Sequence, residues 1–273
     1  MSAKLHCYYG MPCLEENGTR LDTYARSMVY DLRQYKDGNF WGPFMDDGSG
    51  DVDWEKVEAI MILLGYNLRL FSRRTAGGWP MFWDTPFDGI VRNSFISPPL
   101  KSPRDEPIPP IEALDPYQIT GCWMRVVCFL DYTDLHHFNF GLDHAAPDHE
   151  PRPPLDTEEA IRLITMGLTI TRIAAPSEDD GQGLPVVHFS GQSRSMHASW
   201  DPNANSSIRG TVRLTKEGEV RWTTISVFHG EERWRSEGVQ VGGVRSARGV
   251  LGTWFDKYTS SFQFSANRIL ADI

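Results

Sequence analysis

The region 207–256 restricts the fold of this chain more than any other, because apolar and polar side chains alternate through its first part. Val212 and Leu214 are separated from their apolar neighbours by polar residues, which is the period of a strand with one buried face. The turns at 216–218 and 229–231 each contain a glycine, which can adopt the positive φ of a tight hairpin. The region therefore predicts about four strands of one antiparallel meander.

Further strands are expected upstream, at 121–130, 135–141, 165–171, 186–190 and 195–200. With the meander they predict a closed antiparallel β-barrel of about eight strands, since their number and spacing favour a barrel over a sandwich. Around Gly238 the apolar side of the strand changes parity, which predicts a bulge of the kind that bends strands around a barrel. A barrel of this size can hold one small ligand or close over its own side chains.

The chain before the barrel is predicted to be helical and irregular. Apolar residues recur at helical spacing over 21–35 and 53–73, with Asp22 and Asp53 as the expected N-caps. The stretch 75–117 is rich in proline and aromatic residues, and it predicts an irregular strap that docks on the barrel.

These patterns predict a mainly β fold, α+β overall. Its expected parts are a disordered leader at 1–20, a helical and proline-rich layer at 21–117, the barrel at 118–257 and an atypical tail at 258–273. Within the barrel region, 157–164 is expected to form one short helix, because Asp156 can cap its start and acidic residues occupy its first turn.

Composition excludes several classes of protein. A net charge of −9 and an isoelectric point near 5.4 disfavour nucleic-acid binding, which requires an excess of Lys and Arg. No apolar run reaches the roughly 18 residues that a membrane-spanning helix needs, and the amino-terminal segment lacks the core of a secretory signal. Cys122 and Cys128 are too far apart along one strand to bridge each other. The four cysteines are therefore expected to be thiols in an intracellular protein, cytoplasmic or nuclear.

No catalytic set, cofactor site or metal site is predicted. The richest group of metal-ligating residue types is His136, His137, Asp143, His144, Asp148 and His149. Its spacing suits a solvated, proline-bearing loop better than one face of an element. Gly191 to Ser195 nearly match a nucleophile elbow, but the final glycine is missing and no strand–turn–helix context is expected.

A mixture of tryptophan and arginine marks the candidate binding residues, which are Trp123, Arg125, Arg221, Trp222, Arg233, Trp234 and Arg235. Such mixtures are enriched where proteins grip partners, because they combine contact area with directed donors. Two alternatives remain open. The arginines face outward while the tryptophans fill the core, or Trp123, Arg125, Trp222 and Trp234 line a cavity for a small molecule.

Several strings of the sequence resemble the region that follows the F-box in a family of filamentous-fungal F-box proteins. They are FWGPFMDDGSGDVDWEKVEAIMILLGYNLRLF at 40–71, SPPLKSP at 97–103, IPPIEALDPY at 108–117, GCWMRVVCFLDY at 121–132, TVRLTKEGEVRWTTISVFHGEERWRSEGVQVGG at 211–243 and GVLGTWFD at 249–256. The pair Gly121 and Trp123 also resembles the first strand of lipocalin-like barrels.

The resemblance implies a protein-binding module, the substrate receptor of a cullin-type ubiquitin ligase, which selects a target protein or peptide segment. A helical F-box is not found in the sequence, so a Skp1-type adaptor is an expected partner only of a form that contains one. The alternative is a small-molecule-binding, lipocalin-like barrel or a barrel enzyme of fungal metabolism. The interior should discriminate between the two, because a small ligand needs converging polar groups there.

Overall fold

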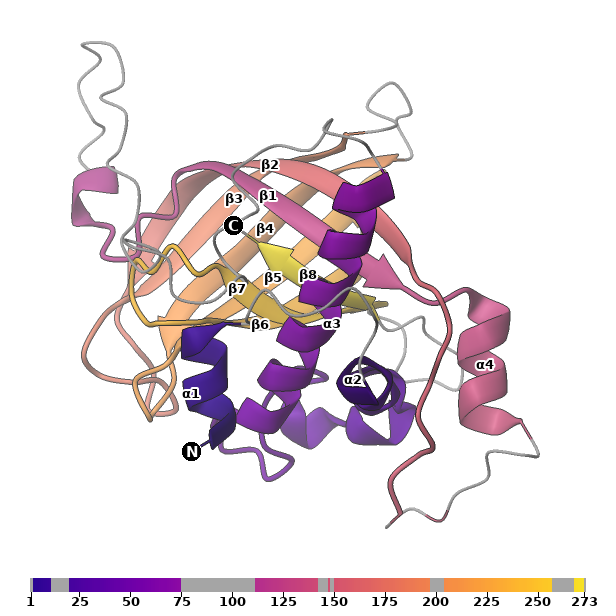
Figure 1. Ribbon diagram of the computed structural model, residues 1–273. Coiled ribbons are helices and arrows are strands. Elements are labelled where there is room, and N and C mark those ends of the chain that lie inside the picture. The colour runs from indigo at the N-terminus through magenta and orange to yellow at the C-terminus, as the bar shows by residue number, and fades with distance from the viewer. Residues whose placement is uncertain are drawn as a thin grey trace.

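The computed structural model describes residues 2–10, 20–74, 111–141, 147, 150–196, 204–256 and 268–272 (Figure 1). The α-helices are α1 (Ser2–Tyr9), α2 (Arg20–Tyr30), α3 (Trp54–Arg74) and α4 (Tyr132–Phe140), and the short 3-10 helices are η1 (Leu32–Gln34), η2 (Asp37–Asn39) and η4 (Glu112–Leu114). The strands are β1 (Gly121–Phe129), β2 (Ala160–Ala174), β3 (Val186–Ser195), β4 (Asn205–Leu214), β5 (Val220–Phe228), β6 (Glu231–Gln240), β7 (Val250–Asp256) and β8 (Arg268–Asp272).

Each strand from β1 to β7 pairs antiparallel with the next, so that they form one continuous, curled sheet (Figure 1). The short β8 pairs with β7 on one side and with β1 on the other, and the strand order thereby closes on itself. The prediction of a mainly β fold with a barrel-like antiparallel sheet is confirmed. The tight hairpins at Gly218 and Gly230 have the positive φ that the sequence predicted, at 88° and 86°.

Alternate side chains of the strands form two separate cores. Those that point into the barrel, such as Val187, Val212 and Trp222, pack together with Tyr117 and Ile119 from the segment before β1. Because side chains of a strand alternate between its faces, the intervening residues of β1 and β7 point outward. Val126 and Cys128 of β1 and Leu251 of β7 contribute in this way to the second core, which lies between the barrel and the helices.

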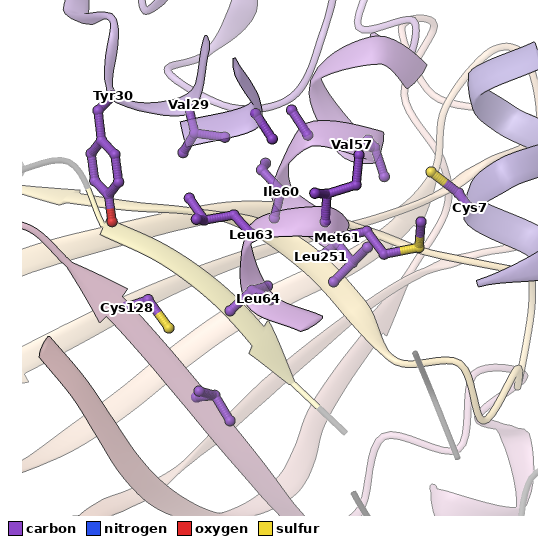
Figure 2. Close-up of a cluster of buried hydrophobic side chains, with 14 of the residues drawn as sticks. Cys7, Val29, Tyr30, Val57, Ile60, Met61, Leu63, Leu64, Cys128 and Leu251 are labelled. Carbon is purple, nitrogen blue, oxygen red and sulfur yellow. The ribbon is translucent and has the colours of Figure 1, made fainter. Parts of the chain in front are cut away.

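The helix α3 contributes more residues to the second core than any other element. Figure 2 shows Ile60 and Leu64 of α3 between α2 and the sheet, where Leu251 of β7 and Cys128 of β1 lie. Ile60 and Leu64 are fully buried, so the apolar stripe that predicted this helix is the surface that packs. The N-cap is also confirmed, since the Asp53 carboxylate accepts a hydrogen bond from the Lys56 amide at 3.1 Å.

Two local predictions for the amino-terminal layer were wrong. Residues 2–9, expected to be part of a disordered leader, form α1, because Ala3 and Cys7 are buried, Cys7 in the second core. Burial raises the pKa of the Cys7 thiol to about 12, and the described cysteines Cys7, Cys122 and Cys128 are free thiols. Asp22 does not cap α2, since it is the third residue of that helix.

Three predictions for the barrel region were also wrong. The segment 135–141 is helical, because Asp131 caps α4 by accepting a hydrogen bond from the Thr133 amide at 2.8 Å. The segment 157–164 runs into β2 instead of forming a helix, since its backbone pairs with β1. The register is regular at Gly238, whereas the irregularity between β5 and β6 lies between Ser226 and Val227. The described residues do not include 75–110 of the strap predicted at 75–117, the end of the predicted strand 195–200, or most of the tail.

The end of α2 is joined to α4 through a buried ion pair. Asp31, which directly follows α2, accepts hydrogen bonds from Arg33 Nη2 at 2.8 Å and from Arg152 Nε at 3.1 Å. Arg152 also donates to the carbonyl oxygens of Phe138 and Asn139 in α4. Burial acts to raise the pKa of Asp31, but the hydrogen bonds from Arg33 and Arg152 outweigh it and hold the pKa below its ordinary value of 3.8.

This geometry predicts a loss of stability in acid. Because the pKa of Asp31 is lower in the folded chain than in the unfolded one, its carboxylate stabilises the fold above pH 3.8, and that contribution is lost as pH falls through the lowered pKa. Urea denaturation at a series of pH values should show a smaller acid-induced loss for Asp31→Asn than for the wild type. The matched control is Asp134→Asn, an exposed carboxylate of α4. An equal loss in wild type and Asp31→Asn would contradict the assignment.

Candidate binding site

The barrel is filled with aromatic side chains near the amino-terminal end of β1. The ring centroids of Trp123 and Trp222 lie 4.9 Å apart, and Phe189 lies 5.6 Å from Trp222. Trp222 donates a hydrogen bond from Nε1 to the side-chain oxygen of Gln240 at 3.2 Å, and Trp123 donates from Nε1 to the carbonyl oxygen of Ile119 at 2.8 Å. Both indole N–H groups are thus satisfied, and this end of the interior is closed by packed rings.

Towards the other end, the inward positions of four consecutive strands carry small hydroxyl side chains. They are Ser193 and Ser195 of β3, Ser206 of β4, Thr224 and Ser226 of β5, and Ser236 of β6, all buried. The hydroxyl groups of Ser193 and Ser206 lie 2.7 Å apart and share a hydrogen bond. We call these six residues the hydroxyl layer.

Arg125 and a second pair of tryptophans also face the interior in this half of the barrel. Arg125 shares the inward parity of Trp123 and Val127 on β1 and is only 2% exposed. It lies opposite Ile164 of β2, which in turn lies opposite Ser195 of the hydroxyl layer. The ring centroids of Trp234 and Trp254 are 5.0 Å apart, Trp234 on β6 beside Ser236 and Trp254 on the neighbouring β7. One half of the interior thus combines a guanidinium, hydroxyl groups and indole rings.

Arg221 and Arg235 point to the outside of the barrel, where a buried carboxylate holds both. Glu237, fully buried, accepts hydrogen bonds from Arg221 Nε at 2.9 Å and from Arg235 Nη2 at 2.5 Å. Thr223 donates its hydroxyl to the same carboxylate at 3.0 Å. The loop that contains Gly42 packs directly on Glu237. A Cβ added to Gly42 would lie 2.7 Å from the Cβ of Glu237, so only glycine fits at this position.

Arg233 occupies a third environment, at the irregularity between β5 and β6. Because Val227 lies opposite Glu232 and Ser226 lies opposite Trp234, Arg233 is the extra residue of a bulge. Its side chain is 62% exposed, lies over the Trp234 ring at 5.9 Å and is 3.9 Å from the Asp256 carboxylate.

The seven candidate residues therefore do not form one surface. Trp123, Arg125, Trp222 and Trp234 lie in the barrel interior, Arg221 and Arg235 on the outer face, and Arg233 at the rim. Arg221 and Arg235 face outward while Trp222 packs in the core, as the first alternative expected. Arg125 and Trp234 face inward, as the second alternative expected, so both alternatives stay open.

Among the described residues, neither the group of histidines and aspartates nor the elbow-like string at 191–195 forms the site that its residue types would suggest. His136 and His137 lie on α4, and the other histidines and aspartates of that group lie outside the described residues. In the described part of the chain, no three His, Cys, Asp or Glu side chains are grouped as metal ligands. Gly191 lies within β3, where a Cβ would collide with the carbonyl oxygen of Gly167, so this glycine serves the close approach of two strands.

Sequence reasoning missed a second buried carboxylate, Glu159. Its side chain is fully buried and accepts hydrogen bonds from Tyr30 Oη at 2.5 Å, Asn67 Nδ2 at 2.7 Å and Arg26 Nε at 3.1 Å. Burial raises the pKa of Glu159, and Arg26 acts in the opposite direction. The Glu159 side chain lines a small pocket of about 170 Å³ between α3 and the start of β2. No local pattern marks such a residue, because its partners come from two helices far away in the sequence.

No helix among the described residues is both long enough and apolar enough to cross a membrane. Comparison with protein-family models, with curated proteins and with solved structures finds no match to this chain.

Proposed function

We propose that this chain is a lipocalin-like, ligand-binding barrel that takes a small, largely apolar molecule with a polar or acidic group. The observation that supports it is the hydroxyl layer, which faces the interior beside Arg125 and the pair Trp234 and Trp254. The chemistry is that of binding, in which apolar and aromatic walls supply affinity and a few polar groups orient the ligand.

Side-chain size favours a ligand in this half of the barrel. An eight-stranded barrel is just wide enough for its side chains to fill it or for one small ligand to occupy it. Large rings fill the end at Trp222, whereas serine or threonine occupies six inward positions of β3 to β6 at the other end, beside Trp234 and Trp254. Hydroxyl groups both donate and accept hydrogen bonds, so this wall can orient the polar atoms of a ligand.

The proposal is tested with anilinonaphthalene sulfonate, a fluorescent apolar ring system with one anionic group. We expect saturable binding with a dissociation constant on the order of micromolar and quenching of tryptophan fluorescence. Ser226→Phe, which fills the hydroxyl layer, should weaken binding at least about tenfold, roughly the effect of losing 1.4 kcal/mol. Ser236→Leu is the second filling variant, and Arg233→Ala at the rim is the control.

Thermal melting of each variant shows whether it is folded. Probe binding that is absent from the folded wild type, or that persists unchanged in both folded filling variants, would refute a site in the interior. Unchanged binding in Arg233→Ala is expected, since Arg233 lies at the bulge and not inside the barrel.

The substrate-receptor function implied by the resemblance to F-box proteins is a second proposal. It is favoured by the exposed Arg233 over the Trp234 ring, since arginine and tryptophan are enriched where proteins bind partners. Affinity purification with the tagged chain should recover a target protein together with a Skp1-type adaptor, and Arg233→Ala should reduce recovery of the target alone. Recovery of neither protein, in a preparation that retains a small molecule, would favour the barrel-ligand proposal instead.

A further inference from the structure

A cleft of about 450 Å³ opens on the outer face of the barrel, apart from the proposed interior site. Its floor is formed by β4, β5 and β6, and its wall by the loop that carries Phe40 and the residues from Gly48 to Gly50. Three arginines from the three strands line it, namely Arg213, Arg221 and Arg235. None of the sequence patterns identified this cleft, because the loop that forms its wall is distant in the sequence from the strands.

Arg221 is held rigidly with its terminal nitrogens towards the cleft. Its guanidinium lies 4.1 Å from the ring centroid of Phe40 and 4.7 Å from that of Phe44, and its Nε bonds to Glu237. Its Nη1 is 3.8 Å from the position that a Cβ on Gly50 would take. With Nε committed to the buried carboxylate, Nη1 lies beside Gly50, a residue that presents backbone rather than side chain. Such fixed guanidinium groups bind oxyanions with little loss of entropy.

Arg213 supplies a donor that lacks an acceptor. It reaches Asp180 with Nη1 at 3.4 Å and the Thr211 hydroxyl with Nη2 at 3.0 Å. Its Nε–H is buried and has no hydrogen-bond acceptor among the described residues. Since a buried donor without a partner costs free energy, a shift of the Arg213 side chain that brings an acceptor to Nε would be favourable.

The three arginines of the cleft outnumber the carboxylates that contact them. Two carboxylates, Asp180 and Glu237, contact the three guanidinium groups, and Asp179 is paired with Lys216 at 3.0 Å. One of three cationic charges is therefore not balanced by a contacting carboxylate, in a chain whose net charge is −9. An anion would be drawn to this cleft against the overall charge of the protein.

We propose that the cleft is a binding site for the oxyanion group of a small ligand, either a phosphate or a carboxylate. Arg221 and Arg235 form its base, positioned from behind by Glu237, and Arg213 contributes from the side. Planar guanidinium groups donate paired hydrogen bonds to both kinds of oxyanion, and such charge-assisted bonds are stronger than neutral ones. This proposal is independent of the interior site, since the two lie on opposite faces of the same strands.

The probes are inorganic phosphate and acetate, titrated at constant ionic strength with chloride as the balancing anion. We expect one of them to bind saturably by calorimetry and to raise the melting temperature. Arg213→Gln and Arg235→Gln should each weaken that binding about tenfold, as expected when a charge-assisted hydrogen bond is lost. The control is Arg209→Gln, which removes an outward arginine of β4 that pairs with Glu232 outside the cleft.

Each outcome decides between named alternatives. Saturable binding of phosphate but not acetate assigns the cleft to phosphate-bearing ligands, and the reverse assigns it to carboxylates. Binding of neither probe to the folded wild type, or equal affinity in the wild type and both cleft variants, would overturn the proposal. Because the interior is tested with a different probe and by Ser226→Phe, absence of binding at one site leaves the test of the other site intact.

Discussion

Replacing Glu159 by alanine is expected to lower the free energy of unfolding by about 3–5 kcal/mol, the range for breaking a buried ion pair by removing one partner. The side chain of Arg26 is only 3% exposed, so its charge would be left in the interior without a carboxylate. Tyr30 and Asn67 would lose their acceptor at the same time. Removal of this carboxylate thus affects α2, α3 and β2 together.

The neighbouring residue provides a matched control. The Glu158 carboxylate accepts a hydrogen bond from Arg74 Nη2 at 2.8 Å, but both side chains are largely exposed. Glu158→Ala should therefore leave the urea midpoint nearly unchanged. The double variant Arg26→Ala/Glu159→Ala should be less destabilised than the sum of the single variants, because no uncompensated charge remains. Equal midpoints for Glu158→Ala and Glu159→Ala would show that the buried pair does not hold the helical layer on the barrel.

Replacing Glu237 by alanine should cost about 3 kcal/mol, the lower end of the range for a broken buried pair. The lower value is expected because the Arg235 side chain is 39% exposed and can be rehydrated, whereas that of Arg221 is 14% exposed between two aromatic rings. Thr223 would also lose its acceptor. The loop at Gly42, which packs directly on Glu237, should loosen as a result.

Chemical denaturation measures the loss of stability, and hydrogen exchange of the amides in the loop 40–50 tests whether that loop loosens. Glu237→Gln keeps one acceptor oxygen and should lose less stability than the alanine variant. Glu231→Ala, an exposed carboxylate of the same strand, is the control. Increased exchange across the whole barrel, with no excess in the loop, would mean that Glu237 acts on the sheet and does not anchor the loop.

The features predicted well from the sequence are those carried by a local period. The strands β4 and β5 follow the alternation that predicted them, and the apolar stripe of α3 agrees with the residues that it buries. The same period placed Trp222 inside the barrel, because residues two apart on a strand share a face. Predictions failed where the signal was a single polar residue. Asp156 suggested a helix start, yet the chain that follows pairs as β2, while Asp131 caps a helix that no apolar period marked.

The sequence by itself determined the strand period, the long helix and the inward set of tryptophans, because each depends on neighbours a few residues apart. Only the tertiary structure decided that Arg221 and Arg235 pair with a buried carboxylate, and that Glu159, directly before β2, bonds to side chains of two helices. The physical reason is that the local sequence does not determine the environment of a charged side chain. Whether it is solvated, paired or buried depends on what covers that face of the sheet, and in this chain the covering elements come from the opposite end of the sequence.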